Sequence, residues 1–178
     1  MLPSFPFQSL LDWYRVHGRT HLPWRVFSGL PEKEIAYRVW LSEILLQQTQ
    51  APRVVGFFNR ILERFPTIEK LAEARYEEFF PYYDGLGYYS RARNLLAAAR
   101  MITEEYDGIF PRESELLRKL PGVGPYTAEA IRAFAYDIPT LSFDTNLEKV
   151  FSRYYFADRH RKLLVAEKTE IISDFLVG

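Results

Sequence analysis

Two carboxylates have settings that suit acid–base chemistry. Glu43 lies in residues 39–46, where apolar side chains fall nearly all round at the helical angle of ~100° per residue, so the pattern predicts a buried helix. Burial raises the pKa of a carboxyl and keeps its proton available. Asp144 has the position of an N-cap, where the helix dipole and free N–H groups favour the ionised form. Two such carboxylates can supply one site with both an acid and a stabilising anion.

Each carboxylate also has an ordinary structural interpretation. A glutamate in a buried helix often pairs with a buried arginine, and an aspartate before a helix is often no more than an N-cap. Position alone does not separate the two interpretations, so the decision depends on the rest of the chain.

A third pattern is the string Leu-Pro-Gly-Val-Gly at residues 120–124, which lies between two amphipathic segments and is followed by Thr127 and Ala128. Gly122 and Gly124 allow a tight turn close to a ligand, and the second helix presents unpaired N–H groups to a phosphate. The string is typical of a helix-hairpin-helix that binds nucleic acid without reading its sequence. A glycine-rich turn between two helices is the alternative.

The composition excludes several classes of chemistry. The chain has 178 residues and no cysteine, which excludes disulfides, thiolate nucleophiles and iron–sulfur clusters, and its three histidines suggest no metal site. The net charge of zero is unusual for a nucleic-acid binder, although backbone contacts to phosphates do not need a positive charge. No apolar run approaches the ~20 residues of a membrane span, so we expect a soluble, cytoplasmic protein that is not secreted.

Helices are the only elements that the pattern predicts to position these residues, and the predicted class is all-α. Pro23 makes residues 21–25 an extended loop, and residues 85–89 form a turn that exposes apolar and aromatic side chains. The predicted helices are 4–17, 31–51, 52–65, 67–74, 76–83, 89–106, 112–120, 125–136, 145–155 and 159–175.

Several of these strings together resemble the helix-hairpin-helix DNA glycosylases with a Gly/Pro-rich loop and a following Asp (HhH-GPD), and within them the adenine-excising MutY type. Enzymes of this type remove adenine mispaired with guanine or 8-oxoguanine. The resemblance implies a monofunctional glycosylase of base-excision repair, acting as a monomer on double-stranded DNA and associated with the nucleoid. The strings that carry the resemblance are residues 22–25, 40–50, 85–89, 91–95, 120–124 and 144–146.

The resemblance implies roles for four residues in catalysis. Glu43 would protonate a ring nitrogen of the departing adenine, and Asp144 would stabilise the oxocarbenium sugar. Tyr126 stands where relatives that resemble endonuclease III carry a Schiff-base lysine, so strand cleavage is not expected. Asn146 would orient the catalytic groups. Hairpin packing for Tyr126 and first-turn polarity for Asn146 are the structural alternatives.

Four further residues resemble the family residues that contact the DNA after adenine is flipped out of the base stack. Gln48, Thr49, Leu86 and Tyr88 would fill the hole and hold the orphan base, with Tyr88 as a wedge beside the oxidised guanine. Helix-end polarity and loop packing are the structural alternatives for these positions.

The adenine pocket and the DNA backbone have their own expected contacts. Arg25 and Leu46 would approach the adenine. Gly122, Val123 and Gly124 of the hairpin would bind the DNA backbone.

We therefore expect an HhH-GPD fold of two helical lobes, with the active site in the cleft between them and Glu43 facing Asp144. A barrel lobe with the hairpin is expected at 29–139, and an incomplete second lobe at 1–28 and 140–178. The family pattern continues past residue 178 with further helices, a four-cysteine cluster loop in most members and a C-terminal domain. Since some members have no cluster, we expect no cofactor in this chain.

Two rival functions stay open at this stage. The chain could be a catalytically incomplete fragment that binds DNA through its hairpin. It could also be a mismatch glycosylase for thymine, since Thr145 stands where MutY members often have glycine. The strings around Gln48 and Tyr88 favour adenine, and whether guanine or 8-oxoguanine is preferred opposite it is left open.

Overall fold

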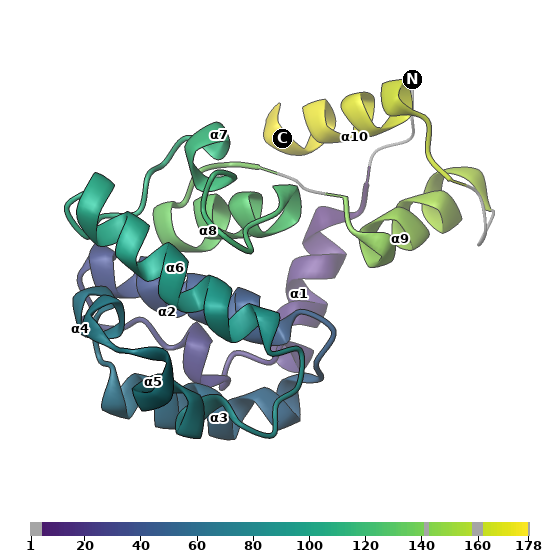
Figure 1. The fold of residues 1–178 in the computed structure, drawn as a ribbon. Coiled ribbons are helices and arrows are strands. Elements are labelled where there is room, and N and C mark those ends of the chain that lie inside the picture. Colours follow the sequence, from purple (N-terminus) through teal and green to yellow (C-terminus); the bar gives the residue numbers. More distant parts are fainter. Residues whose placement is uncertain (1–4, 141–142, 158–161, 178) are drawn as a thin grey trace. The chain divides into compact units, whose positions relative to one another are not determined.

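The computed structural model describes residues 5–140, 143–157 and 162–177, and within them all regular structure is helical, which confirms the predicted class (Figure 1). A short 3₁₀ helix, η1 (Pro23–Arg25), follows the first α-helix. The α-helices are α1 (Phe7–His17), α2 (Glu32–Leu46), α3 (Ala51–Arg64), α4 (Ile68–Glu73), α5 (Tyr76–Tyr83), α6 (Ser90–Glu105), α7 (Ser114–Leu117), α8 (Pro125–Tyr136), α9 (Thr145–Phe156) and α10 (Val165–Val177).

The chain divides into two compact units, each with its own core. The central unit is His21–Ile138, and the terminal unit combines Met1–Thr20 with Pro139–Gly178. Residues 21–28, which the sequence prediction assigned to the terminal lobe, belong to the central unit. The reason is that Trp24 is only 4% exposed and packs edge-on against Phe58, with 5.4 Å between the ring centroids.

Helix α2 forms the middle of the central unit, and the prediction of a buried helix there is confirmed. Eight of its 15 residues are buried, among them Trp40 and Leu41, and it packs against α3, α6 and α8 (Figure 1). Full burial of one large apolar side chain contributes roughly 1.5–3 kcal/mol, so this helix has a well-determined position around Glu43.

Three local predictions differ from the structure. The extended loop at 21–25 contains η1, because Pro23 suits the first position of a turn. The helix expected at 112–120 is reduced to α7, since the chain turns directly after Leu117 into the hairpin. The last helix begins at Val165, because residues 162–164 are not helical, and its predicted start at 159 lies outside the described residues. The Glu167 carboxylate accepts a hydrogen bond from the Leu164 N–H (2.8 Å) just before the helix.

The terminal unit has a small aromatic core. Phe151 of α9 packs there with Leu163 and Ile171, and the ring of Phe5 lies 5.5 Å from that of Phe151. None of the residues of α1 is buried. No helix among the described residues is long and apolar enough to cross a membrane.

Candidate active site

Glu43 lies on the fourth turn of α2 between the buried residues Ser42 and Ile44, and its own side chain is partly buried. Burial raises the pKa of Glu43, and the positive charge of Arg25 opposes this rise. Within the part of the chain that the structure describes, no hydrogen bond or ion pair engages the Glu43 carboxyl. The structural interpretation, in which a buried arginine pairs with Glu43, is therefore not supported by these residues.

Arg25 reaches the neighbourhood of Glu43 from η1. Its guanidinium carbon lies 4.0 Å from the centre of the Phe134 ring on α8, a cation–π contact that orients the charge. Leu46, the last residue of α2, is partly buried against the core. The two residues assigned to an adenine pocket thus belong to the same unit as Glu43.

The segment after α2 carries Gln48 and Thr49. Gln48 has a left-handed backbone (φ 55°), which non-glycine residues seldom adopt, and its side chain is exposed. Thr49 is partly buried and donates its hydroxyl to the carbonyl of Gln47 (3.3 Å). The backbone here is closed by a hydrogen bond from the Thr49 N–H to the Leu46 carbonyl (3.1 Å).

The loop between α5 and α6 carries Leu86 and Tyr88. Tyr88 is 56% exposed and also has a left-handed backbone (φ 52°). Leu86 is only 4% exposed, so the prediction that this turn exposes its apolar side chains was wrong at Leu86. The hydroxyl of Tyr83 donates to the Gly87 carbonyl (2.9 Å), which ties the loop to α5.

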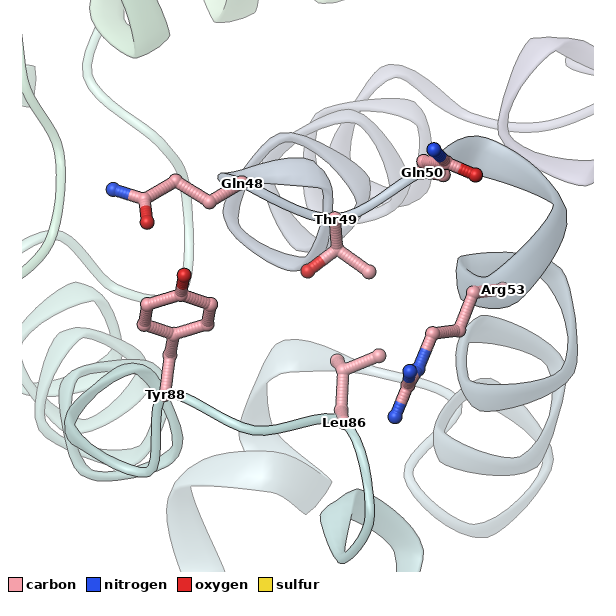
Figure 2. A pocket seen from close by; sticks show the side chains of 6 residues that line it. All are labelled: Gln48, Thr49, Gln50, Arg53, Leu86 and Tyr88. Carbon is pink, nitrogen blue, oxygen red and sulfur yellow. The ribbon is translucent and has the colours of Figure 1, made fainter.

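Gln48, Thr49, Leu86 and Tyr88 come together around a surface hollow of about 270 Å³, although they are far apart in the sequence. Figure 2 shows Leu86 and Tyr88 pointing from one loop toward the segment that carries Gln48 and Thr49. Arg53 of α3 lines the same hollow, and its guanidinium donates a hydrogen bond to the carbonyl of Gly85.

Arg91 of α6 is a residue that the sequence reasoning missed as part of this site. It is 5% exposed, and its Nη1 donates to the carbonyls of Leu45 (2.8 Å) and Ile44 (3.3 Å) at the end of α2. A signal was available in the sequence, because Arg91 shares the inner helical face with Leu95 and Ile102. A cation in such a row of apolar residues needs acceptors from elsewhere in the fold.

The hairpin lies directly beside the end of α2. Gly122 has φ +81°, and a Cβ at this position would meet Asn94 of α6 at 3.2 Å, so glycine is required there. Its carbonyl accepts a hydrogen bond from the Gln47 amide (3.1 Å). Val123 is buried, and its N–H donates to the Leu120 carbonyl (3.0 Å), so neither its side chain nor its N–H is available to a ligand.

We predicted that both hairpin glycines are needed for the tight turn, but the backbone conformation of Gly124 does not require glycine. Its φ of −90° is open to any residue, and the space around its missing side chain is empty. The open space lies immediately before the N-terminus of α8, where Pro125 occupies the first turn. Tyr126, in the same turn, is 45% exposed, whereas the neighbouring Thr127 is buried.

Asp144 forms the predicted N-cap of α9 in the terminal unit. Its Oδ1 accepts hydrogen bonds from the backbone N–H groups of Asn146 (2.9 Å) and Leu147 (2.7 Å). The Asn146 side chain is exposed. These two residues belong to the terminal unit, whereas the other predicted site residues belong to the central unit.

No metal site is evident among the residues that the structure describes. The described residues contain no group of three or more His, Cys, Asp or Glu side chains that could hold a metal ion. The four-cysteine cluster of most members of the resembled family does not fit, since the sequence has no cysteine to ligate it.

Comparison with known proteins places this site in context. The pattern that describes the HhH-GPD superfamily of base excision DNA repair proteins matches residues 41–173. The adenine DNA glycosylase of Buchnera aphidicola subsp. Baizongia pistaciae is 36% identical over 158 residues, which cover 89% of this chain and 43% of that protein. The adenine DNA glycosylase of Rattus norvegicus is 44% identical over 149 residues, covering 82% of this chain and 29% of the rat protein.

The chain therefore spans less than half the length of these curated relatives. Among solved structures, a thermostable thymine-DNA glycosylase has a TM-score of 0.77 at 26% sequence identity, and the match covers 97% of this chain and 77% of that one.

Proposed function

This chain belongs to the HhH-GPD superfamily of base excision DNA repair proteins, and from that premise we propose that it is a monofunctional glycosylase that excises adenine mispaired with 8-oxoguanine or guanine. Two relatives of this name support the choice of adenine. The observation that carries the proposal is the Glu43 carboxyl, which is partly buried, has a raised pKa, and is engaged by no hydrogen bond among the described residues.

The proposed reaction is hydrolysis of the bond between C1′ of the sugar and the adenine ring. Glu43 donates its proton to a ring nitrogen, and the bonding electron pair leaves with the neutral base. The carboxylate of Asp144 stabilises the positive charge that develops on the sugar. A water oxygen then bonds to C1′ and its proton passes to the ionised Glu43 carboxylate, which restores the acid and yields an abasic site in an unbroken strand.

Tyr126 and Asn146 assist this reaction, and no residue at the hairpin position offers an amine for strand cleavage. The Tyr126 hydroxyl assists beside the sugar, and Asn146 orients the catalytic groups. Helix α8 contains no lysine, so its first turn offers no amine for the Schiff base that lyases need. The absence of an amine there supports a monofunctional enzyme.

DNA binding is assigned to the hairpin and the two loops. Backbone N–H groups at the start of α8 bind phosphates, and the open space at Gly124 permits close approach. The side chains around the hollow fill the space that adenine leaves and hold the orphan base. Arg25 and Leu46 contact the extruded adenine. The protein acts as a monomer in the nucleoid, without a cofactor.

Excision of thymine from a mismatch is the second candidate function. The observation that favours it is the structural likeness to a thymine-DNA glycosylase, together with Thr145 at the start of α9. A third outcome is DNA binding without chemistry, since binding of phosphates by the hairpin does not require the Glu43 carboxyl.

Single-turnover assays separate these three functions. Duplexes would carry adenine opposite 8-oxoguanine, adenine opposite guanine, or thymine opposite guanine, each analysed with and without alkali. Adenine-specific breaks that appear only after alkali, and that Glu43→Gln abolishes, support the proposal. Glu34→Gln is the matched control, because it makes the same change in the first turn of the same helix.

The other results are equally informative. Breaks only in the thymine duplex would assign the second function. Salt-sensitive binding with no breaks in any duplex would identify a DNA-binding module. Breaks without alkali would contradict a monofunctional mechanism.

A further inference from the structure

Arg91 contacts both loops that border the hollow, in addition to its contacts with the end of α2. Its Nη1 donates to the carbonyl of Gln47 (2.5 Å), and its Nη2 donates to the Thr49 hydroxyl (3.2 Å). The same Nη2 donates to the Gly87 carbonyl on the other loop (3.3 Å). One guanidinium therefore joins the segment at 47–50 to the loop at 84–89.

The positions of these acceptors explain two unusual backbone conformations. Gln47 and Gly87 directly precede Gln48 and Tyr88, which are the two left-handed non-glycine residues of the site. Holding the carbonyl of the preceding residue fixes the peptide plane from which the next φ angle is measured. Arg91 thus stabilises both rare conformations through the peptide before each of them.

The side chains of Gln48 and Tyr88 line the same hollow, and their directions follow from these backbone angles (Figure 2). The Arg91 guanidinium carbon also lies 5.1 Å from the centre of the Tyr88 ring, so the cation orients the ring as well as its backbone.

We propose that Arg91 is a positioning residue that couples the two loops, so that Gln48 and Tyr88 enter DNA as one preorganised unit. The DNA step of this inference rests on the proposed function, whereas the coupling itself is a property of the free protein. Arg91 does not touch the reacting atoms in this proposal.

A purely structural role accounts poorly for these contacts. Capping the end of α2 needs only the bonds to Ile44 and Leu45, yet the guanidinium extends beyond them to two loops. Its Nε is buried without a hydrogen-bond partner, and no carboxylate among the described residues pairs with the charge. A buried cation with an unsatisfied N–H is costly for stability.

Hydrogen exchange of the free protein tests the coupling. In Arg91→Met we expect amide exchange to accelerate about tenfold or more in both 47–50 and 84–89, because charge-assisted bonds to both loops are lost. Arg91→Lys should protect one loop only, since an ammonium lacks the planar fork that reaches both. Arg93→Met, an exposed change on the same helix, should accelerate neither loop.

Exchange that changes in neither loop of Arg91→Met, or in one loop alone, overturns the coupling. If Arg91→Met does not fold, Arg91→Lys decides, and wild-type exchange in both loops of that variant would refute the proposal.

A second experiment tests the DNA step in the Glu43→Gln background, where no base is excised. A 2-aminopurine placed beside the target adenine becomes fluorescent when the strand unstacks. Adding Arg91→Met should abolish most of the fluorescence rise and leave binding to undamaged duplex, which depends on the hairpin, within about twofold. An unchanged rise would refute the role in DNA. If wild-type protein excises no adenine, the proposed function fails, while hydrogen exchange still judges the coupling.

Discussion

The side-chain amide of Gln47 donates a hydrogen bond to the carbonyl of Gly122 (3.1 Å), and this bond joins the end of α2 to the hairpin. This bond therefore fixes the position of the helix that carries Glu43 relative to the turn that is assigned to phosphate binding. Binding of a DNA backbone at the hairpin would place the nucleotide at a defined position relative to α2.

Replacement of Gln47 by leucine tests this link. Gln47→Leu removes the donor and leaves a carbonyl without its partner, so the free energy of unfolding should fall by about 1 kcal/mol. The excision rate should fall by a larger factor than the DNA affinity. The hairpin of this variant still binds phosphates, but it no longer fixes the position of α2. Urea unfolding and single-turnover rates measure the two effects. Asn59→Leu, which replaces an exposed amide of α3 that does not line the hollow, is the control, and equal losses in both variants would contradict the link.

The two hairpin glycines should respond differently to a methyl group. Gly122→Ala combines a left-handed φ with a clash against Asn94, so we expect a loss of roughly 1–3 kcal/mol in the free energy of unfolding. Gly124→Ala has open space and an ordinary φ, and its stability should change by less than about 1 kcal/mol. That variant should nevertheless bind duplex DNA more weakly, as measured by fluorescence anisotropy. Wild-type affinity would mean that no ligand approaches Gly124.

The raised pKa of Glu43 predicts a pH dependence of excision. The protonated acid is the active form, so the single-turnover rate should fall as pH rises through this pKa. Arg25→Met removes the charge that lowers the pKa, and the decline should then shift to higher pH. A decline that stays at the same pH would show that another group controls the rate.

The same shift has a consequence for stability. Because the folded-state pKa of Glu43 lies above the unfolded value, the folded protein binds more protons between the two values, and stability falls as pH rises through this window. Glu43→Gln cannot ionise, so its stability relative to wild type should increase across the window. Thermal unfolding on both sides of the window measures this, and a constant difference would contradict the shift.

Asp144 offers a way to separate capping from catalysis. Asparagine caps a helix about as well as aspartate, so Asp144→Asn should keep the stability of the terminal unit within about 0.5 kcal/mol, while Asp144→Ala should lose about 1 kcal/mol. If the carboxylate stabilises the sugar cation, both variants should lose excision to a similar extent. An active Asp144→Asn would leave Asp144 with the structural role alone.

Local patterns in the sequence determined most of the fold. The all-round apolar pattern about Trp40 produced the buried α2, the proline at the start of α8 and Asp144 before α9 marked real helix starts, and Gly122 marked a turn that only glycine can make. These features depend on residues within one or two turns of each other, so periodicity and capping rules can identify them.

Tertiary structure alone decided how the site is held. Four of the five acceptors of Arg91 lie 42 to 47 positions earlier in the sequence, and no local rule connects them to Arg91, whereas the fifth, Gly87, is four positions away. The left-handed conformation of Gln48 is held by those long-range bonds, and the burial of Leu86 follows from packing. A sequence states which groups need partners, but which partners they find depends on how distant segments pack together.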